Sequence, residues 1–239
     1  MSDKPSSRRR SGRSARRALA LSAVGVLALS GCGLDLHPGA AATINGTVLA
    51  QDDVDDLVSS LCSYIDVANA GSASPQQYGV AELRATVTAA LISFDLLDEA
   101  AADLGLTIEP ADVDALAAQN QIPDSLSATD SERVTDFFHD GAESQVTQET
   151  IGAHLKDETV TSSSDASSTD VNASSDYVTD YFAKQDIIVS PQYGTWDGSV
   201  VNQGSGSLSD AVSPAATAAV PRSDGSTDVS GLPDSQVCG

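Results

Sequence analysis

Cysteine and histidine, two residue types that often act as nucleophiles, acid–base groups or metal ligands, are rare in this chain. It has three cysteines and three histidines, and the histidines stand far apart in sequence, at His37, His139 and His154. A zinc site needs several convergent His or Cys ligands, and a serine hydrolase needs a base and an orienting acid near its nucleophile. The sequence contains neither a Gly-x-Ser-x-Gly turn nor a glycine-rich phosphate-binding loop. We therefore expect a protein that is not an enzyme and that has no metal ion or other cofactor.

The first cysteine, Cys32, follows a segment that is typical of exported proteins. Seven Lys and Arg residues lie within the first 17 positions, an apolar run extends over residues 18–29, and two small residues follow. Charged, apolar and small regions in this order form a secretory signal, and the apolar run is too short to span a bilayer. We expect residues 1–31 to be a signal peptide. The pair Arg16-Arg17 leaves twin-arginine export open beside the general secretory route.

The end of this segment, Leu29-Ser30-Gly31-Cys32, resembles the lipobox of bacterial lipoproteins, in which an aliphatic residue and two small residues precede a cysteine. The resemblance implies that the Cys32 thiol receives a diacylglyceryl group and becomes the new N-terminus after cleavage. Acyl chains such as palmitate would then hold the protein on the outer face of the cell membrane. The alternative is an ordinary signal peptide that happens to contain a cysteine.

The expected mature chain is strongly acidic. Seven of the 12 basic residues and one of the 34 acidic residues lie in positions 1–31, so five basic and 33 acidic residues remain, a formal charge of −28. Such a chain repels nucleic-acid phosphates and anionic lipid headgroups, so we expect no nucleic-acid partner and membrane attachment through the lipid alone. The acidity favours solubility or salt tolerance, and attraction of a basic client is the second interpretation.

Two cysteines, Cys62 and Cys238, remain after lipidation. Disulfides persist outside the cytoplasm, and a bridge between these two would tie an early helix to the end of the sequence. The chain-entropy model allows about 4–5 kcal/mol of stabilisation for so long a loop, less any strain. Two unbonded thiols remain the alternative.

Apolar periodicity predicts four helices followed by a shorter fifth. Residues 54–68 and 80–104 carry stripes at spacings of three and four, and further helices are expected from Pro110 and over residues 130–155. Acidic residues over positions 52–56 suit a helix start better than a calcium site. A short helix from Ser175 and a strand over 187–189 complete the pattern. Trp196 is expected to pack this returning segment onto the helices, with ligand contact as the alternative.

Two segments resemble the N-terminal domain of SurA-type chaperones and PrsA-type foldase lipoproteins. Residues 44–54, Ile-Asn-Gly-Thr-Val-Leu-Ala-Gln-Asp-Asp-Val, are similar to the family's opening strand, Asn-Gly turn and first helix. Residues 90–113 are similar to its long helix, which ends in a Leu-Gly-aliphatic-Thr turn before another helix with an acidic start. The matches occur in the family's order and cover about 70 residues, from Ile44 to Val113; the similarity fades after about Ile122.

The resemblance implies a helical lobe whose groove holds extended, apolar stretches of unfolded protein. Many family members also carry a parvulin-type prolyl isomerase domain before the returning helix. Here a Ser/Asp-rich segment, too short for that domain, takes its place, so we do not expect isomerase activity. The family has no short catalytic motif in this lobe, and no site residue is transferred.

These patterns predict a mainly α fold, a SurA N-terminal-like lobe with a small β element formed by the N-terminal strand and a returning C-terminal strand. The expected parts are a signal peptide (1–31), a tether (32–42), the helical lobe (43–156), a flexible Ser/Asp-rich linker (157–174), a returning helix and strand (175–198) and a poorly ordered tail (199–239). The function expected is that of a lipid-anchored, extracytoplasmic, chaperone-like protein that binds unfolded or extended exported polypeptides. The alternative is an envelope scaffold or binding lipoprotein with one dedicated protein partner.

Overall fold

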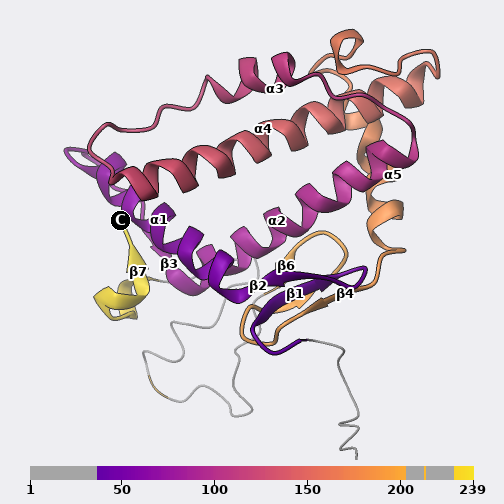
Figure 1. The fold of residues 1–239 in the computed structure, drawn as a ribbon. Helices are drawn as coiled ribbons and strands as arrows, with labels where there is room; N and C mark the ends of the chain where they lie inside the picture. The colour runs from indigo at the N-terminus through magenta and orange to yellow at the C-terminus, as the bar shows by residue number, and fades with distance from the viewer. Residues whose placement is uncertain (1–36, 203–212, 214–228) are drawn as a thin grey trace, which may run out of the picture. The chain divides into compact units, whose positions relative to one another are not determined.

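The computed structural model describes residues 37–202, 213 and 229–239, so the expected signal peptide and Cys32 lie outside the described residues. The described part is mainly helical, with five α-helices and small antiparallel sheets, which confirms the expected fold class at that level (Figure 1). The helices are α1 (Gln51–Asn69), α2 (Val80–Asp103), α3 (Pro110–Ala117), α4 (Ala128–Lys156) and α5 (Val171–Phe182). The strands are β1 (Ala40–Ile44), β2 (Thr47–Ala50), β3 (Tyr78–Gly79), β4 (Ile187–Val189), β5 (Thr195–Trp196), β6 (Val201–Asn202) and β7 (Val237–Cys238).

Strand β1 is the centre of the largest sheet, which has the order β2-β1-β4. All five of its residues are buried, with Ala40, Ala41 and Ala42 between 0% and 3% exposed. These alanines were assigned to a tether at the sequence level, and that assignment is wrong. Their small side chains carry little hydrophobic signal, but they allow β1 to lie close to the helices on both faces of the strand.

The β1–β2 hairpin turns at Asn45-Gly46, as the sequence predicts. Both residues have positive φ, 49° and 85°, which matches the type I′ turn that suits the twist of paired strands. The expected return of the chain is also confirmed, because β4 pairs antiparallel with β1 and places Ile187 opposite Ile44.

The packing of α2 and α4 forms the middle of the helical layer (Figure 1). Ile92, Leu96 and Leu97 of α2 are almost completely buried in one core cluster with Ile44 and Ile151. Helix α2 ends in a Schellman motif: the N–H of Leu106 donates to Ala101 O and that of Gly105 to Ala102 O. Gly105 has φ 68°, so the predicted glycine stop is confirmed.

Helix α4 is continuous through Gly141 and Gln145, two residues near its middle. Aromatic contacts hold it to its neighbours: the ring centroids of Phe137 and Phe94 of α2 are 5.8 Å apart, and those of Phe138 and Tyr64 of α1 are 5.4 Å apart. Tertiary packing of a few large side chains thus offsets the weak helix propensity of the glycine.

The segment expected to be a flexible linker, residues 157–174, is structured, so that prediction is wrong. Ser163 is buried; its hydroxyl accepts from the N–H of Glu109 at 2.8 Å and donates to Asp112 Oδ2 at 2.6 Å. A parallel bridge joins Thr107 to Ser162. Serine, threonine and aspartate can order a segment through local hydrogen bonds without burying large apolar side chains, and a hydrophobicity argument misses this.

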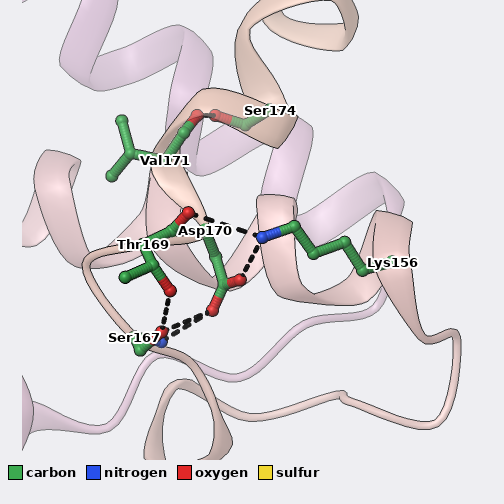
Figure 2. A network of polar contacts seen from close by, with 6 residues as sticks. All are labelled: Lys156, Ser167, Thr169, Asp170, Val171 and Ser174. Carbon is green, nitrogen blue, oxygen red and sulfur yellow. Dashed lines mark hydrogen bonds and ion pairs between the residues drawn. The ribbon is translucent and has the colours of Figure 1, made fainter.

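The same segment begins α5 four residues earlier than predicted, at Val171 rather than Ser175. Figure 2 shows the contacts that hold this junction to the end of α4: Lys156 Nζ pairs with the Asp170 carboxylate and also donates to Thr169 O at 3.4 Å. The other Asp170 oxygen accepts from the N–H and the hydroxyl of Ser167. These bonds lower the pKa of Asp170, the Lys156 hydrogen bond most of all.

The end of the described chain returns to the helices at two places. Trp196 is partly buried against the main core cluster, with its ring 6.3 Å from that of Phe182, so the expected packing role is confirmed. Strand β7 pairs with β3 near the start of α2. The remaining tail, for which a poorly ordered state was expected, lies largely outside the described residues.

Within the described residues, no helix combines the length and the hydropathy that crossing a membrane would require.

A tight approach of α4 to α5 gives a first prediction. A Cβ on Gly152 of α4 would lie 2.0 Å from Asp170 O, whereas a Cβ on Gly141 of the same helix would lie 3.8 Å from its nearest contact, Phe94. We expect Gly152→Ala to lower the free energy of unfolding by about 2 kcal/mol, as overpacking does. The control Gly141→Ala should raise it by about 0.5–1 kcal/mol, because alanine is the better helix former. Urea denaturation of both variants measures the difference; an unchanged midpoint for Gly152→Ala contradicts the packing described here.

Candidate functional site

A small pocket lies where α2, α4 and strand β2 meet. Its volume is about 290 Å³. Three apolar side chains, Leu49, Leu91 and Phe94, form part of its lining. The rest of the lining is acidic and comes from two helices: Asp95 and Asp98 of α2, and Asp140 and Glu143 of α4. We refer to this cavity as the acidic pocket.

Helical periodicity places these residues together. Leu91, Phe94, Asp95 and Asp98 follow one another at spacings of three, one and three, which puts them on one stripe of α2. On α4 the spacing of three between Asp140 and Glu143 has the same effect. The packing of Phe94 against Phe137 of α4 then brings the two acidic stripes face to face.

The pocket raises the pKa of the carboxyl groups that line it. Burial, and after it the negative charges of Glu143, Asp95 and Asp140, raises the pKa of Asp98 to about 6. Burial also raises the pKa of Asp95, with a smaller contribution from Glu99. The pKa of Asp140 is raised by burial and then by Glu143, while His139 opposes the shift. Like charges are therefore held close together at neutral pH in a partly desolvated place.

No Lys or Arg ion pair among the described residues neutralises this charge. Arg84 pairs with Asp55 across the α1–α2 contact, Arg133 pairs with Asp56 across the α1–α4 contact, and Lys156 pairs with Asp170. The acidic pocket thus has an excess of negative charge that a cation from outside could neutralise.

A metal ion is one kind of cation that this region could hold. His139, Asp140 and Glu143 each offer a ligand atom within 4.8 Å of the others, the one such group among the residues that the structure describes. His139 Nε2 also lies 3.5 Å from Asp114 Oδ1, so an acidic neighbour already occupies one ring nitrogen. The grouping lies partly on the surface of α4, and nothing else in the described structure points to a metal there.

A second cavity, of about 500 Å³, lies between α4 and the start of α5. Its lining is mainly neutral and polar and consists of Gly141, Ser144, Gln145, Gln148, Glu149, Ser168, Val171 and Asn172. Amide and hydroxyl groups can hydrogen-bond many ligands, so this lining does not select one chemical class.

Apart from His139, which lies beside Asp140 and Glu143, the residues singled out in the sequence lie elsewhere. Cys62 of α1 and Cys238 of β7 are joined by a disulfide, with their Cα atoms 4.9 Å apart. Cys32 lies outside the described residues. His37 is exposed, and His154 Nδ1 lies 2.8 Å from Val160 O, away from the acidic pocket.

Sequence reasoning missed the four carboxylates of the acidic pocket. A signal for two of them was present, because Asp95 and Asp98 continue the stripe of Leu91 and Phe94 where a further apolar residue would be expected. In the structure both carboxylates are exposed, beside the half-buried Leu91 and Phe94.

The raised pKa of Asp98 predicts how a neutral variant behaves. Because the folded-state pKa of about 6 exceeds the ordinary value of 3.8, ionisation of Asp98 destabilises the fold progressively as the pH rises between these values. We expect Asp98→Asn to match the natural protein at pH 4 and to have a Tm about 2–4 °C higher at pH 7.5. Thermal unfolding at both pH values tests this. Asp180→Asn, on the exposed face of α5, controls for the general loss of one negative charge, and an equal gain from it would remove the special role of Asp98.

Comparison with known proteins gives no match: no family model, no characterised protein and no solved structure is similar to this chain at the level at which a relationship is accepted.

Proposed function

We propose that this chain is a lipid-anchored, extracytoplasmic, chaperone-like protein that binds extended polypeptide segments carrying Lys or Arg. The observation that supports this most directly is the position of the acidic pocket beside β2, one edge of which has no partner among the described strands. The proposed ligand is a segment rather than a folded surface, since the pocket is narrow and the strand edge is short.

The pocket suits one long basic side chain. Its volume of about 290 Å³ lies at the lower limit of small-molecule sites, which are usually about 300–1,000 Å³. Lys and Arg side chains combine an apolar stem with a charged head. Leu49, Leu91 and Phe94 would contact the stem, and the carboxylates of Asp98 and Glu143 would face the head. A bound cation would also relieve the repulsion that raises the pKa of Asp98.

Strand β2 supplies a place for the backbone of such a segment. It lies at one end of the β2-β1-β4 sheet, so one of its edges has no strand partner in that sheet. Leu49 of β2 is part of the pocket wall, and Val48 beside it is 43% exposed. A segment that adds to this edge by main-chain hydrogen bonds would pass the mouth of the pocket, in the manner of β-strand addition.

The overall charge supports the same ligand class. The expected mature chain has a formal charge of −28, and a field of that sign increases the encounter rate of basic segments. The large apolar side chains that are exposed in the described residues are Val48 of β2, Leu155 of α4 and Val200 between β5 and β6, so they come from three separate places in the chain. This distribution favours selection by charge over capture by a broad apolar surface.

The resemblance of residues 44–113 to the N-terminal domain of SurA-type and PrsA-type proteins agrees with a ligand that is an extended polypeptide. The proposal therefore includes membership of this family, and it assigns the protein no isomerase or other enzymatic activity. Export and attachment through Cys32 belong to the proposal on the strength of the sequence signal alone.

A second candidate function is that of an envelope scaffold with one dedicated protein partner. The docking of β7 onto β3 favours it, because the chain's own last segment covers that strand edge. The two candidate functions differ in the number of partners: a chaperone-like protein binds many basic segments, whereas a scaffold binds one dedicated protein.

A peptide-binding experiment tests the pocket. We expect a fluorescent peptide of alternating Val and Lys to bind the mature protein at pH 7.5, and its counterpart with Gln in place of Lys to bind much more weakly. The double variant Asp98→Asn/Asp140→Asn should lose about tenfold in affinity, about 1.4 kcal/mol, because it removes two of the carboxylates that line the pocket. Fluorescence anisotropy measures this.

The matched control is Asp176→Asn/Asp180→Asn, which removes the same charge from exposed positions of α5 and should retain the affinity. Equal losses in the two double variants would show that long-range charge, rather than the pocket, binds the peptide. Lowering the pH from 7.5 to 5 should also weaken binding, since Asp98 with a pKa of about 6 becomes protonated.

The anchor is tested separately in a bacterial host. We expect the full chain to fractionate with membranes and Cys32→Ser to be recovered in the soluble extracytoplasmic fraction, because its position 32 cannot receive a thioether-linked lipid. Cys62→Ser serves as the control and should remain with the membranes. If Cys32→Ser fractionates like the natural protein, the lipid anchor is excluded.

A further inference from the structure

The last described segment, residues 229–239, contacts α1 through β7 and pairs with β3, directly before the start of α2. It contains two short 3-10 turns, η2 (Val229–Gly231) and η3 (Asp234–Gln236), followed by strand β7 (Figure 1). Strand β7 pairs antiparallel with β3, with Cys238 opposite Tyr78 and Val237 opposite Gly79. We call residues 229–239 the strap.

The disulfide between Cys238 and Cys62 joins the strap to the middle of α1. Beside the bridge, the N–H of Gly239 donates to Asp66 Oδ1 at 2.8 Å, and Gln77 Nε2 donates to Gly239 O at 3.1 Å. The fit is close at this point, because a Cβ on Gly239 would lie 2.2 Å from Gln76 O.

Among the described residues, the bridge is joined by the β7–β3 pairing but by few buried side chains of the strap. Neither η2 nor η3 has a buried residue, and Cys238 is the one strap residue that is fully buried. Leu232 and Val237 are only half-buried, and the two hydrogen bonds of Gly239 lie at exposed positions. Ordering a segment costs conformational entropy for each residue, and the strap buries little side-chain surface against the other described residues to oppose that cost.

The bridge makes the docking of the strap an intramolecular event with a high effective concentration. We propose that residues 229–239 are a redox-controlled strap, which covers the edge of β3 while Cys62 and Cys238 are bonded and leaves it when they are reduced. The inference does not depend on the proposed function, because it uses neither the acidic pocket nor β2.

The chemical step is a thiol–disulfide exchange with a dithiol reductant. A thiolate of the reductant attacks one sulfur of the Cys62–Cys238 bond, and the reductant's second thiol then resolves the mixed disulfide. Two electrons and two protons pass to the protein, which gains two thiols, and the reductant becomes a disulfide. An oxidant that accepts two electrons reverses the step.

Release of the strap exposes backbone and side-chain groups that it covers in the described structure. Strand β3 pairs with β7 in the described structure, so the departure of β7 leaves the backbone of Tyr78 and Gly79 unpaired at the start of α2. The Cys62 thiol of α1 also becomes free. Helices α2 and α4 keep their own core contacts, which involve no strap residue.

Hydrogen exchange with mass spectrometry on the full-length protein tests the strap, before and after dithiothreitol, with alkylation to confirm the redox state. On reduction we expect exchange in residues 234–239 and 76–80 to become at least about tenfold faster, while α2 and α4 retain their protection. The variant Cys238→Ser should show the fast exchange without reductant and no further change with it.

Three results would overturn the proposal. The first is that the strap peptides remain protected in fully reduced and alkylated protein. The second is that reduction lowers the protection of α2 and α4 as much as that of the strap. The third is that the untreated protein already carries free thiols at Cys62 and Cys238. The second result would make the bridge a general stabiliser of the fold. If Cys238→Ser does not fold, the reduced natural protein still decides the question.

Discussion

The structure depends most on the complete enclosure of strand β1. Both of its edges are paired, with β2 and with β4, and its residues contribute to two core clusters: Ala42 and Ile44 to one, Ala41 to the other. Backbone groups buried in this way need hydrogen-bond partners, because an unpaired one would be costly. A partner for the second edge is available only if the chain returns after α5. The position of the last helix and of β4 therefore follows from the need to pair a strand about 150 residues earlier in the sequence.

Among the described residues, carboxylates are paired with cations at the helix contacts and are left without such cations in the acidic pocket. Three of the few cations lie at helix contacts, where Arg84, Arg133 and Lys156 each pair with a carboxylate of another element. Arg84 also lies 5.7 Å from the ring centre of Tyr193, whose hydroxyl donates to Asp55. The acidic pocket has no such partner among these ion pairs. An isolated exposed pair contributes at most about 1 kcal/mol, so these cations mainly neutralise repulsion where acidic helices meet. The pocket, where that neutralisation is missing, is the place at which an external cation has the most to contribute.

Local signals predicted the elements well where one residue type has one dominant effect. The stripes of α1 and α2, Asn45-Gly46, Gly105 and the apolar strand Ile187–Val189 all lie where the sequence indicated. The predictions failed where small or polar residues are ordered by their surroundings. Ala40–Ala42 look like a spacer because alanine has little hydrophobic area, and residues 157–170 look like a linker because their hydroxyl and carboxyl groups act through hydrogen bonds to a distant helix start.

The sequence by itself determined the helical character, the turns and the acidity, because each depends on residues that are near one another along the chain or on composition. Only the tertiary structure decided the acidic pocket and the bridge. Asp98 and Glu143 come from helices separated by another helix and two loops, and their coupling arises from the way Phe94 packs on Phe137. Cys62 and Cys238 are 176 residues apart, and their proximity follows from the pairing of β7 with β3. Distances between remote segments are set by packing, and packing is not encoded in any local pattern of residues.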